Sequence, residues 1–373
     1  MSRDKRTESF FPEQSSSMNP SPRKNRATMQ DIATAAGISR MSVSLALRDS
    51  SRISAQTKKR VLQVADEMGY RTNPMVSALM KQLRFTKTRR ASSALAFLTA
   101  YPTRNGWRLT GPGLAFYQGV QAHAEKLGFG LEIVWAKEPG MNGKQMSALL
   151  QARNIGGIIV APMARACGHL TLNWNLFSSV ILGYSSYRPN LHRTTSDTYQ
   201  VTQLALRKLW HLGYRRIGLV LPSQVDTRTH YTFSAAYLRF QCSLKRAYQI
   251  NPFMPSRHPI NAQCLDWFHK EKPEAVLSVV PEVKGWLEKE AGMKAPRDYG
   301  FALLSVSNEN RGLYAGIDQR LGKIGAAAVE MVSKQMFHGE TGIPRIPQRV
   351  LIEGVWLDGP TVPVSSSVAH QAD

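Results

Sequence analysis

Residues 40–44 bring together side chains that suit contact with nucleic acid, namely Arg40, Met41, Ser42 and Ser44. An arginine can read a guanine with two parallel hydrogen bonds, and serine hydroxyls can donate to phosphate oxygens. The four residues fall near the start of a segment with helical spacing. The first turn of a recognition helix is the part that enters the major groove of DNA.

The elements that would position these side chains follow from the spacing of apolar residues. Residues 29–36 repeat apolar side chains at helical intervals, and residues 37–39 then interrupt the helix. Gly37 can end the first helix in the left-handed conformation, and Ser39 can cap the second through its hydroxyl. A third helix is predicted from the N-cap Ser54, with a core made by Val61, Leu62, Val64, Ala65 and Met68. An ordinary αα-hairpin would show the same helix-glycine-helix pattern, so that alternative stays open at this point.

Charge and a second motif favour DNA as the partner. The first 92 residues hold 18 Lys and Arg against 7 Asp and Glu, which gives half of the formal net charge of +22. Such a field attracts phosphate. Residues 70–74 lead into a short amphipathic turn at residues 75–79, where Leu79 is available as an apolar wedge. An apolar side chain pushed into a minor-groove step kinks the duplex.

Residues 27–83 resemble, without a gap, the DNA-binding domain of LacI/GalR-type transcription regulators. The signatures lie at residues 27–33, 36–39, 43–44, 52–54, 57, 60–61, 69–70, 73 and 79. The resemblance implies that Arg40, Met41 and Leu45 face bases, and that Leu79 is the hinge leucine inserted at the centre of the operator. It implies contacts with the DNA backbone for Thr28, Ser42, Ser44, Ser54, Thr57, Tyr70 and Asn73, and it places Arg48 among the DNA-binding residues.

The sequence departs from the family pattern in two places. Leu45 stands where the family commonly has Arg or Lys, so an apolar contact, such as one with a thymine methyl, is expected in place of a guanine contact. In the hinge, Pro74 and Ser77 replace the usual residues. Proline is tolerated in the first turn of a helix, so Pro74 favours initiation of the hinge helix, whereas Ser77 removes a long polar contact.

Composition divides the chain into five predicted segments. Residues 1–26 are expected to form a disordered basic arm, residues 27–72 the helix-turn-helix domain, and residues 73–92 the hinge helix and a basic linker. Residues 93–360 are expected to form a two-lobed domain for effector binding and dimerisation, and residues 361–373 a flexible tail. The arm either contacts phosphates or is a solvated tail, and the linker either contacts the DNA backbone or spaces the domains.

Short apolar runs alternate with helical patterns after residue 93, which predicts a parallel α/β sheet. Strands are expected at residues 94–98, 131–135, 157–160, 216–220, 274–278, 301–304 and 349–352. Helices are expected at residues 114–127, 144–153, 198–212, 235–248, 282–291 and 321–336. This order resembles the ligand domain of LacI/GalR regulators. The expected fold is therefore an all-α helix-turn-helix domain with a hinge helix, followed by an α/β two-lobed, periplasmic-binding-protein-like (type I) domain.

The effector pocket is where the sequence departs furthest from the family. Phe233 stands where sugar-binding members place an arginine, and polar family pairs are replaced at residues 280–281 and 307–308. Sugar recognition needs directed hydrogen bonds and usually an aromatic face. Candidates to supply these are Tyr101, Trp107, Tyr184, Asp197, Arg228, His230, Phe233, Glu282, Asn308 and Glu309. Each of them also fits a surface or hinge residue with no ligand.

Other kinds of chemistry find little support in the sequence. The three cysteines, Cys167, Cys242 and Cys264, lack metal-ligand spacing and suit reduced thiols in a cytosolic protein. No metal motif, nucleophile elbow or phosphate-binding loop is present, so neither a cofactor nor an enzymatic activity is expected. Residues 111–113 fit either a plain loop or a turn before a helix whose amides bind an anion. No apolar stretch suits a membrane span or a signal peptide, which predicts a cytoplasmic protein.

A ligand-controlled regulator accounts for the basic head, the hinge and the α/β body together. The expected form is a homodimer, most simply a repressor, on a near-palindromic double-stranded operator, with a sugar or sugar derivative as effector between the lobes. A soluble periplasmic-type binding protein shares the body but would need a signal peptide, and an enzyme would need a catalytic constellation. A ligand-independent regulator or an architectural DNA-binding protein with a repurposed cleft remains the alternative.

Overall fold

A computed structural model describes residues 27–47, 52–70, 94–164, 168–256 and 261–362. The chain forms two compact units, Met1–Met80 and Lys81–Asp373, and each is described by itself. The predicted arm (1–26) and the predicted hinge and linker (73–92) lie outside the described residues.

The described part of the first unit is a bundle of three helices, α1 (Met29–Ala36), α2 (Arg40–Ala46) and α3 (Ala55–Glu67). Its core consists of Ile32, Ala33, Val43, Ala46, Val61 and Ala65. The three predicted helices are therefore confirmed. The prediction of a core position was wrong for two residues, because Leu62 is 54% exposed and Met68 is 37% exposed. Both lie on α3 or at its end, on the side turned away from α1 and α2.

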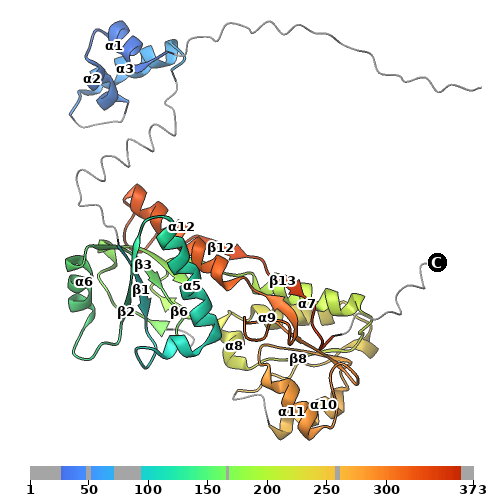
Figure 1. Ribbon diagram of the computed structural model, residues 1–373. Coiled ribbons are helices and arrows are strands. Elements are labelled where there is room, and N and C mark those ends of the chain that lie inside the picture. Colours follow the sequence, from blue (N-terminus) through green and yellow to red (C-terminus); the bar gives the residue numbers. More distant parts are fainter. Residues whose placement is uncertain (1–26, 48–51, 71–93, 165–167, 257–260, 363–373) are drawn as a thin grey trace, which may run out of the picture. The chain divides into compact units, whose positions relative to one another are not determined.

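The second unit contains two α/β lobes (Figure 1). In the first lobe, six parallel strands have the order β12-β7-β5-β3-β1-β2. Their bounds are β1 (Ala94–Thr99), β2 (Gly130–Trp135), β3 (Ile155–Val160), β5 (Ser178–Leu182), β7 (His192–Ser196) and β12 (Arg349–Ile352). Helices α5 (Gly111–Lys126) and α12 (Leu321–His338) cover one face, and α6 (Gly143–Ala152) packs on the other. Short elements complete the lobe: η1 (Gly106–Leu109), β4 (Gly168–His169), η2 (Trp174–Leu176) and β6 (Ser186–Arg188).

The second lobe contains a five-stranded sheet of order β13-β11-β10-β9-β8, in which only the pairing of β11 with β13 is antiparallel. The strands are β8 (Ile217–Val220), β9 (Ala275–Ser278), β10 (Gly300–Leu303), β11 (Ala315–Asp318) and β13 (Val355–Leu357). Helices α7 (Thr198–His211) and α9 (Thr232–Gln241) bury one face, while α10 (Ala262–Glu271) and α11 (Glu282–Glu290) bury the other. Helix α8 (Ser223–Arg228) and η3 (Arg246–Tyr248) lie in connections.

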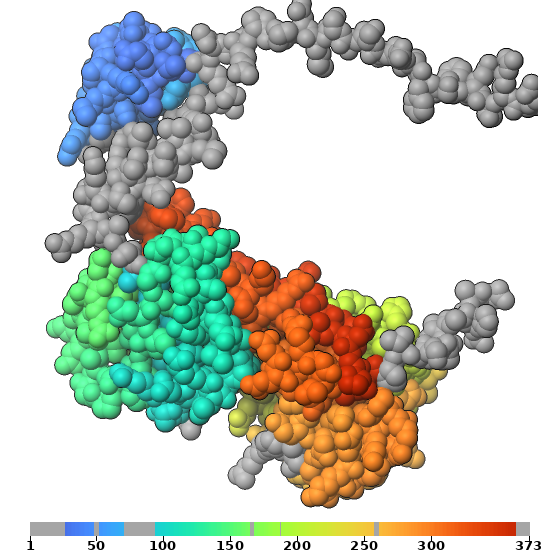
Figure 2. Space-filling model, in the orientation of Figure 1, coloured from blue at the N-terminus to red at the C-terminus, as the bar shows by residue number. Residues whose placement is uncertain are grey.

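The chain passes between the two sheets three times. It leaves the first sheet after β7, returns to it through α12, and leaves again between β12 and β13. In Figure 2 the orange-red segments of residues 321–357 run from the green first lobe to the orange second lobe. Three connections of this kind permit a hinge between the lobes, because each is short and lies at the end of an element.

Three predicted boundaries need correction. The helix predicted at residues 235–248 is α9, which ends at Gln241 and is followed by a separate turn at η3. Residues 111–113 are neither a loop nor a turn before a helix, since they form the first turn of α5 behind the N-cap Thr110. The predicted tail begins too early, because Thr361 and Val362 are 3% and 4% exposed and pack into the second lobe.

Candidate nucleic-acid interface and lobe junction

The helix-turn-helix is fixed by its helix ends. The Thr28 side chain accepts from the amide of Asp31, and the Asp31 carboxylate accepts from the Thr28 amide at 2.7 Å, which completes a capping box. Its hydrogen bonds with Thr28 lower the pKa of Asp31. Gly37 ends α1 with φ at +64°, and Ser39 then caps α2 by accepting from the amide of Ser42 at 3.1 Å.

One face of α2 is buried and the opposite face is open. Val43 and Ala46 point into the bundle and are at most 2% exposed. Met41 is 75% exposed, Arg40 is exposed, and Leu45 is partly exposed. The three side chains predicted to face bases are therefore available together.

The hydroxyls predicted to contact phosphate are already engaged in helix caps. Ser42 shares a hydrogen bond of 2.9 Å with Ser39, Thr57 shares one of 2.8 Å with Ser54, and Thr28 donates to Asp31 at 2.8 Å. Ser44 is partly exposed on α2, and Tyr70 packs against the bundle core. Since a hydroxyl both donates and accepts, the caps orient these groups and do not block them.

Three further predicted DNA contacts, Arg48, Asn73 and Leu79, lie outside the described residues. Their roles stay predictions from the sequence.

The structure brings together two of the predicted effector residues. Tyr184 follows β5 in the first lobe and His230 follows α8 in the second, and their ring centroids are 4.8 Å apart. Residues His230 and Tyr231 both have positive φ, at 56° and 61°. Backbone of this kind costs energy for residues other than glycine and often occurs where a loop is held for a function.

Two arginines from neighbouring strands flank this pair. The guanidinium of Arg193 (β7) lies 5.4 Å from the centre of the Tyr184 ring, and that of Arg349 (β12) lies 5.7 Å from it. Partial burial, followed by the positive charges of Arg193 and Arg349, lowers the pKa of His230. The two cations beside the ring thus disfavour its protonated form.

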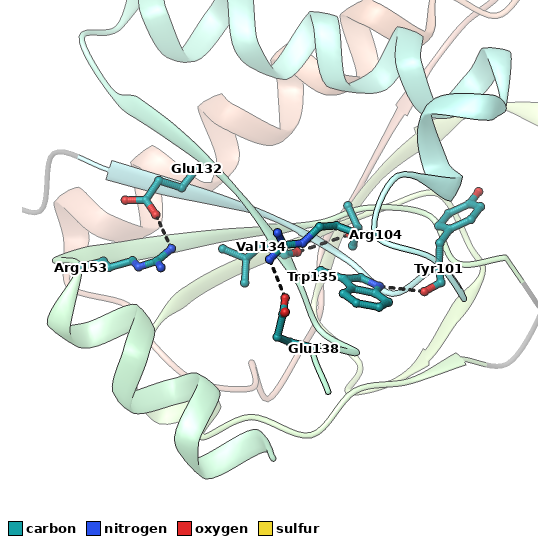
Figure 3. Close-up of polar contacts among 8 residues, drawn as sticks. Tyr101, Arg104, Glu132, Val134, Trp135, Glu138 and Arg153 are labelled. Atoms are coloured by element: carbon teal, nitrogen blue, oxygen red, sulfur yellow. Dashed lines mark hydrogen bonds and ion pairs between the residues drawn. The ribbon is translucent and has the colours of Figure 1, made fainter. Parts of the chain in front are cut away.

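The other predicted effector residues occupy several different elements. Tyr101 is 9% exposed, and its carbonyl accepts from the Trp135 ring at 2.9 Å, beside the ion pairs of Arg104 with Glu138 and of Arg153 with Glu132 (Figure 3). Trp107, whose ring packs at a tilt against those of Phe97 and Tyr117, is also buried. Phe233 is buried in the core of the second lobe. Asp197 caps α7, Arg228 ends α8, and Glu282, Asn308 and Glu309 are exposed.

With this geometry the chain can be compared with known proteins. Residues 28–73 match the sequence model of the family described as "Bacterial regulatory proteins, lacI family". This helix-turn-helix domain belongs to the lacI family. The match starts at the N-cap of α1 and runs through α2 and α3, so the lacI-family domain includes every described residue that was predicted to touch DNA.

Curated relatives of this chain are named as transcriptional regulators or regulatory proteins. The HTH-type transcriptional regulator PtxS of Pseudomonas plecoglossicida is 26% identical over 224 residues, which cover 60% of this chain and 61% of the relative. The maltose regulon regulatory protein MalI of Escherichia coli K12 is 27% identical over 199 residues, which cover 52% of this chain and 53% of the relative. The chain thus spans between half and two thirds of the length of these relatives.

Solved structures share the two-lobed fold. The lac repressor dimer bound to operator and the anti-inducer ONPF matches with a TM-score of 0.51 at 16% identity. The match covers 91% of this chain and 99% of the repressor chain. A complex of the transcriptional regulator CelR with cellobiose matches with a TM-score of 0.50 at 15% identity, covering 90% of this chain and 100% of the other. In the part of the chain that the structure describes, no helix is long and apolar enough to cross a membrane.

Sequence reasoning did not single out Arg193 and Arg349 as candidates. Both are charged residues in strands of a parallel sheet, where apolar runs are the rule. A charged residue within a strand of such a sheet was the signal that could have identified them. The strand register that places Arg349 beside Arg193 could not be predicted from the sequence.

A separate cavity of about 690 Å³ lies in the first lobe, between the ends of β1, β2 and β3 and the start of α6. Its lining includes Lys137, Asn142, Met146, Met163 and His169. None of the predicted effector residues lines this cavity, and it lies wholly in one lobe.

Proposed function

We propose that this protein is a cytoplasmic, sequence-specific DNA-binding transcriptional regulator, most simply a repressor. In this proposal two chains bind a near-palindromic operator, and a small carbohydrate-related effector bound between the two lobes controls that binding.

The observation that carries the DNA-binding part is the open face of α2. Met41 is 75% exposed and Arg40 is exposed, while the capped turn from Gly37 to Ser39 fixes how α2 leaves α1. A recognition helix reads base edges with the first residues of its solvent face. The lacI-family match over residues 28–73 supports the same role.

Effector control is supported by the second unit. Solved proteins of this fold are described as bound to an operator and an anti-inducer, or to cellobiose. In this chain three short connections join two lobes, and side chains from both lobes meet at Tyr184 and His230. A ligand that contacts both lobes favours one angle between them, because it can shift an equilibrium only through contacts that differ between the states. Pairing of two chains would place two α2 helices in successive major grooves.

Selection of binding sites from a random duplex library by the full chain tests the proposal. We expect a near-palindromic motif, and we expect the variant Arg40→Ala to lose preference at one base of each half-site, worth about 1–3 kcal/mol. Lys59→Ala on α3 is the control, because Lys59 is exposed outside α2 and is expected to leave the motif unchanged. No enriched motif with the parent chain would refute specific binding, and an unchanged motif with Arg40→Ala would refute the role of Arg40.

A ligand-independent regulator is the second candidate. It is favoured by Phe233, which is 2% exposed in the core of the second lobe and offers no polar group where sugar-binding relatives are expected to hold an arginine. Operator binding that no small molecule alters, in a chain that still selects its motif, would favour this candidate.

A further inference from the structure

The side chains around Tyr184 form a positively charged cluster at the lobe junction, made of Arg193, Arg349, Tyr184 and His230. Three of them come from the first lobe, and His230 comes from the second. Arg349 and His230 are exposed, whereas Arg193 is only 4% exposed. The cluster therefore has a buried cation behind two groups that a ligand can reach.

Arg193 holds the loop that carries Tyr184. Its guanidinium donates to the carbonyl of Gly183 and, at 3.1 Å, to that of Ser186. Ser186 is 1% exposed, and its hydroxyl has no partner among the described atoms. Arg193 thus acts as a positioning residue for the segment 183–186 and adds a fixed positive charge beneath the Tyr184 ring.

The two arginines of the cluster have no ion-pair partner among the described residues. Burial, followed by the charge of Arg349, lowers the pKa of Arg193 to about 10, so the guanidinium stays charged at neutral pH. A buried charge is costly unless it is paired, and two carbonyl oxygens and one aromatic ring supply only part of the compensation. An anion at this position would supply the rest.

We propose that the positively charged cluster binds the anionic group, a carboxylate or a phosphate, of the effector. Arg349 presents the planar guanidinium that suits two parallel hydrogen bonds to such a group, and His230 reaches it from the other lobe. The bound anion joins the lobes and stabilises one angle between them. This inference rests on the proposed effector control and gives the chemical class of the ligand.

An NMR titration of the histidine ring signals in the full chain, with inorganic phosphate as the probe, provides a direct test. Phosphate replaces chloride at constant ionic strength, and His230→Gln identifies the His230 signal. We expect a saturable shift of that signal, which Arg349→Gln weakens by about tenfold or more, as loss of a charge-assisted hydrogen bond would. Arg345→Gln is the matched control, because it removes the same charge from an exposed residue just before β12 and should leave the shift intact. No shift of His230, or an equal shift in Arg349→Gln, would overturn the site.

A second arm separates the two sources of anion. Glucose, glucuronate and glucose 6-phosphate share one ring and differ at one carbon, so they report the charged group alone. Tighter binding of one of the two anions than of both glucose and inorganic phosphate would support the inference and identify the group. Equal binding of glucose and the anions would overturn it. Operator selection is measured independently, so a chain that binds phosphate at His230 but selects no motif would refute the proposed function and leave the anion site standing.

Discussion

At the scale of single residues, Gly37 determines the turn before α2. Its φ of +64° is the left-handed conformation, and a Cβ added there would meet nothing closer than the Arg60 side chain at 3.8 Å. Gly37→Ala is therefore strained by its backbone and not by a clash, and should destabilise the three-helix bundle by about 1 kcal/mol. Gly37→Asn should recover part of this loss, because asparagine tolerates the conformation. Hydrogen exchange of the amides of α1–α3 in the full chain measures the stability of the bundle in the parent and in both variants. Equal protection in these three proteins would contradict the role of Gly37.

Two histidines of the second unit make its stability depend on pH. Burial is the main cause that lowers the pKa of His192 and of His230, and His192 Nδ1 accepts from the amide of Gln348 at 3.0 Å. In the unfolded chain these two histidines bind protons at pH near 6.5, whereas in the folded chain they bind them only at lower pH. The free energy of unfolding should thus be highest above pH 6.5 and should fall as pH drops through the folded pKa values. Urea unfolding between pH 5 and 8 measures this, and a pH dependence unchanged in His192→Gln and His230→Gln would contradict the assignment.

At the scale of elements, close packing of α5 on α12 depends on glycine. A Cβ at Gly119 would lie 2.1 Å from the carbonyl oxygen of Gly322, and one at Gly325 would lie 2.5 Å from that of Phe116. Gly119→Ala must therefore separate the helices, at a cost of about 1–3 kcal/mol in the free energy of unfolding. Gly285→Ala is the control, because Gly285 lies within α11 with nothing within 4 Å, and alanine there should stabilise by up to about 1 kcal/mol. Denaturant unfolding compares the two, and a Gly119 variant as stable as the parent would refute the close approach.

The elements that periodicity predicted are those with apolar runs, such as β1, β3 and β8. Strands β5 and β7 were missed, because β5 begins with Ser178 and Ser179 and β7 runs through Arg193 and two threonines. Two of these polar side chains are buried with partners that the fold supplies from distant segments. The Ser178 hydroxyl donates to the carbonyl of Glu340 at 2.7 Å, and Thr194 donates to the carbonyl of Ile324 at 3.1 Å. Partners 130 or more residues away are invisible to a local pattern.

The same limit applies to the candidate sites. The base-facing side of α2 could be predicted, because Val43 and Ala46 recur at helical spacing in one short helix. Tyr184 and His230 were each candidates from their residue types, but their contact depends on how two lobes meet. Trp107 looked like a ligand-stacking ring from the sequence, and tertiary packing buries it to 1% exposure against Phe97 and Tyr117.

At the scale of the whole molecule, control of DNA binding requires that the angle between the lobes can change. The three connections between the sheets allow such a change, and the lobes also approach one another away from these connections. A Cβ built on Gly111, at the start of α5 in the first lobe, would lie 3.7 Å from the Cβ of Ser307 in the second. This separation falls in the range of about 3.5–4.5 Å that a disulfide bond requires. The pair is therefore a site at which the lobe angle can be fixed.

We expect the double variant Gly111→Cys with Ser307→Cys to form a disulfide on oxidation, and to hold operator affinity at a single value that an effector no longer changes. Reduction should restore the response, because the covalent link is the only difference between the two forms. Cys242 is exposed, so the variant is made together with Cys242→Ser, and each single cysteine variant serves as the control for oxidation elsewhere. Fluorescence anisotropy on the selected operator measures the affinity of each form. An oxidised protein that responds to effector as the reduced one does would show that the lobe angle does not carry the signal to DNA, since a ligand acts only through the equilibrium that the link has removed.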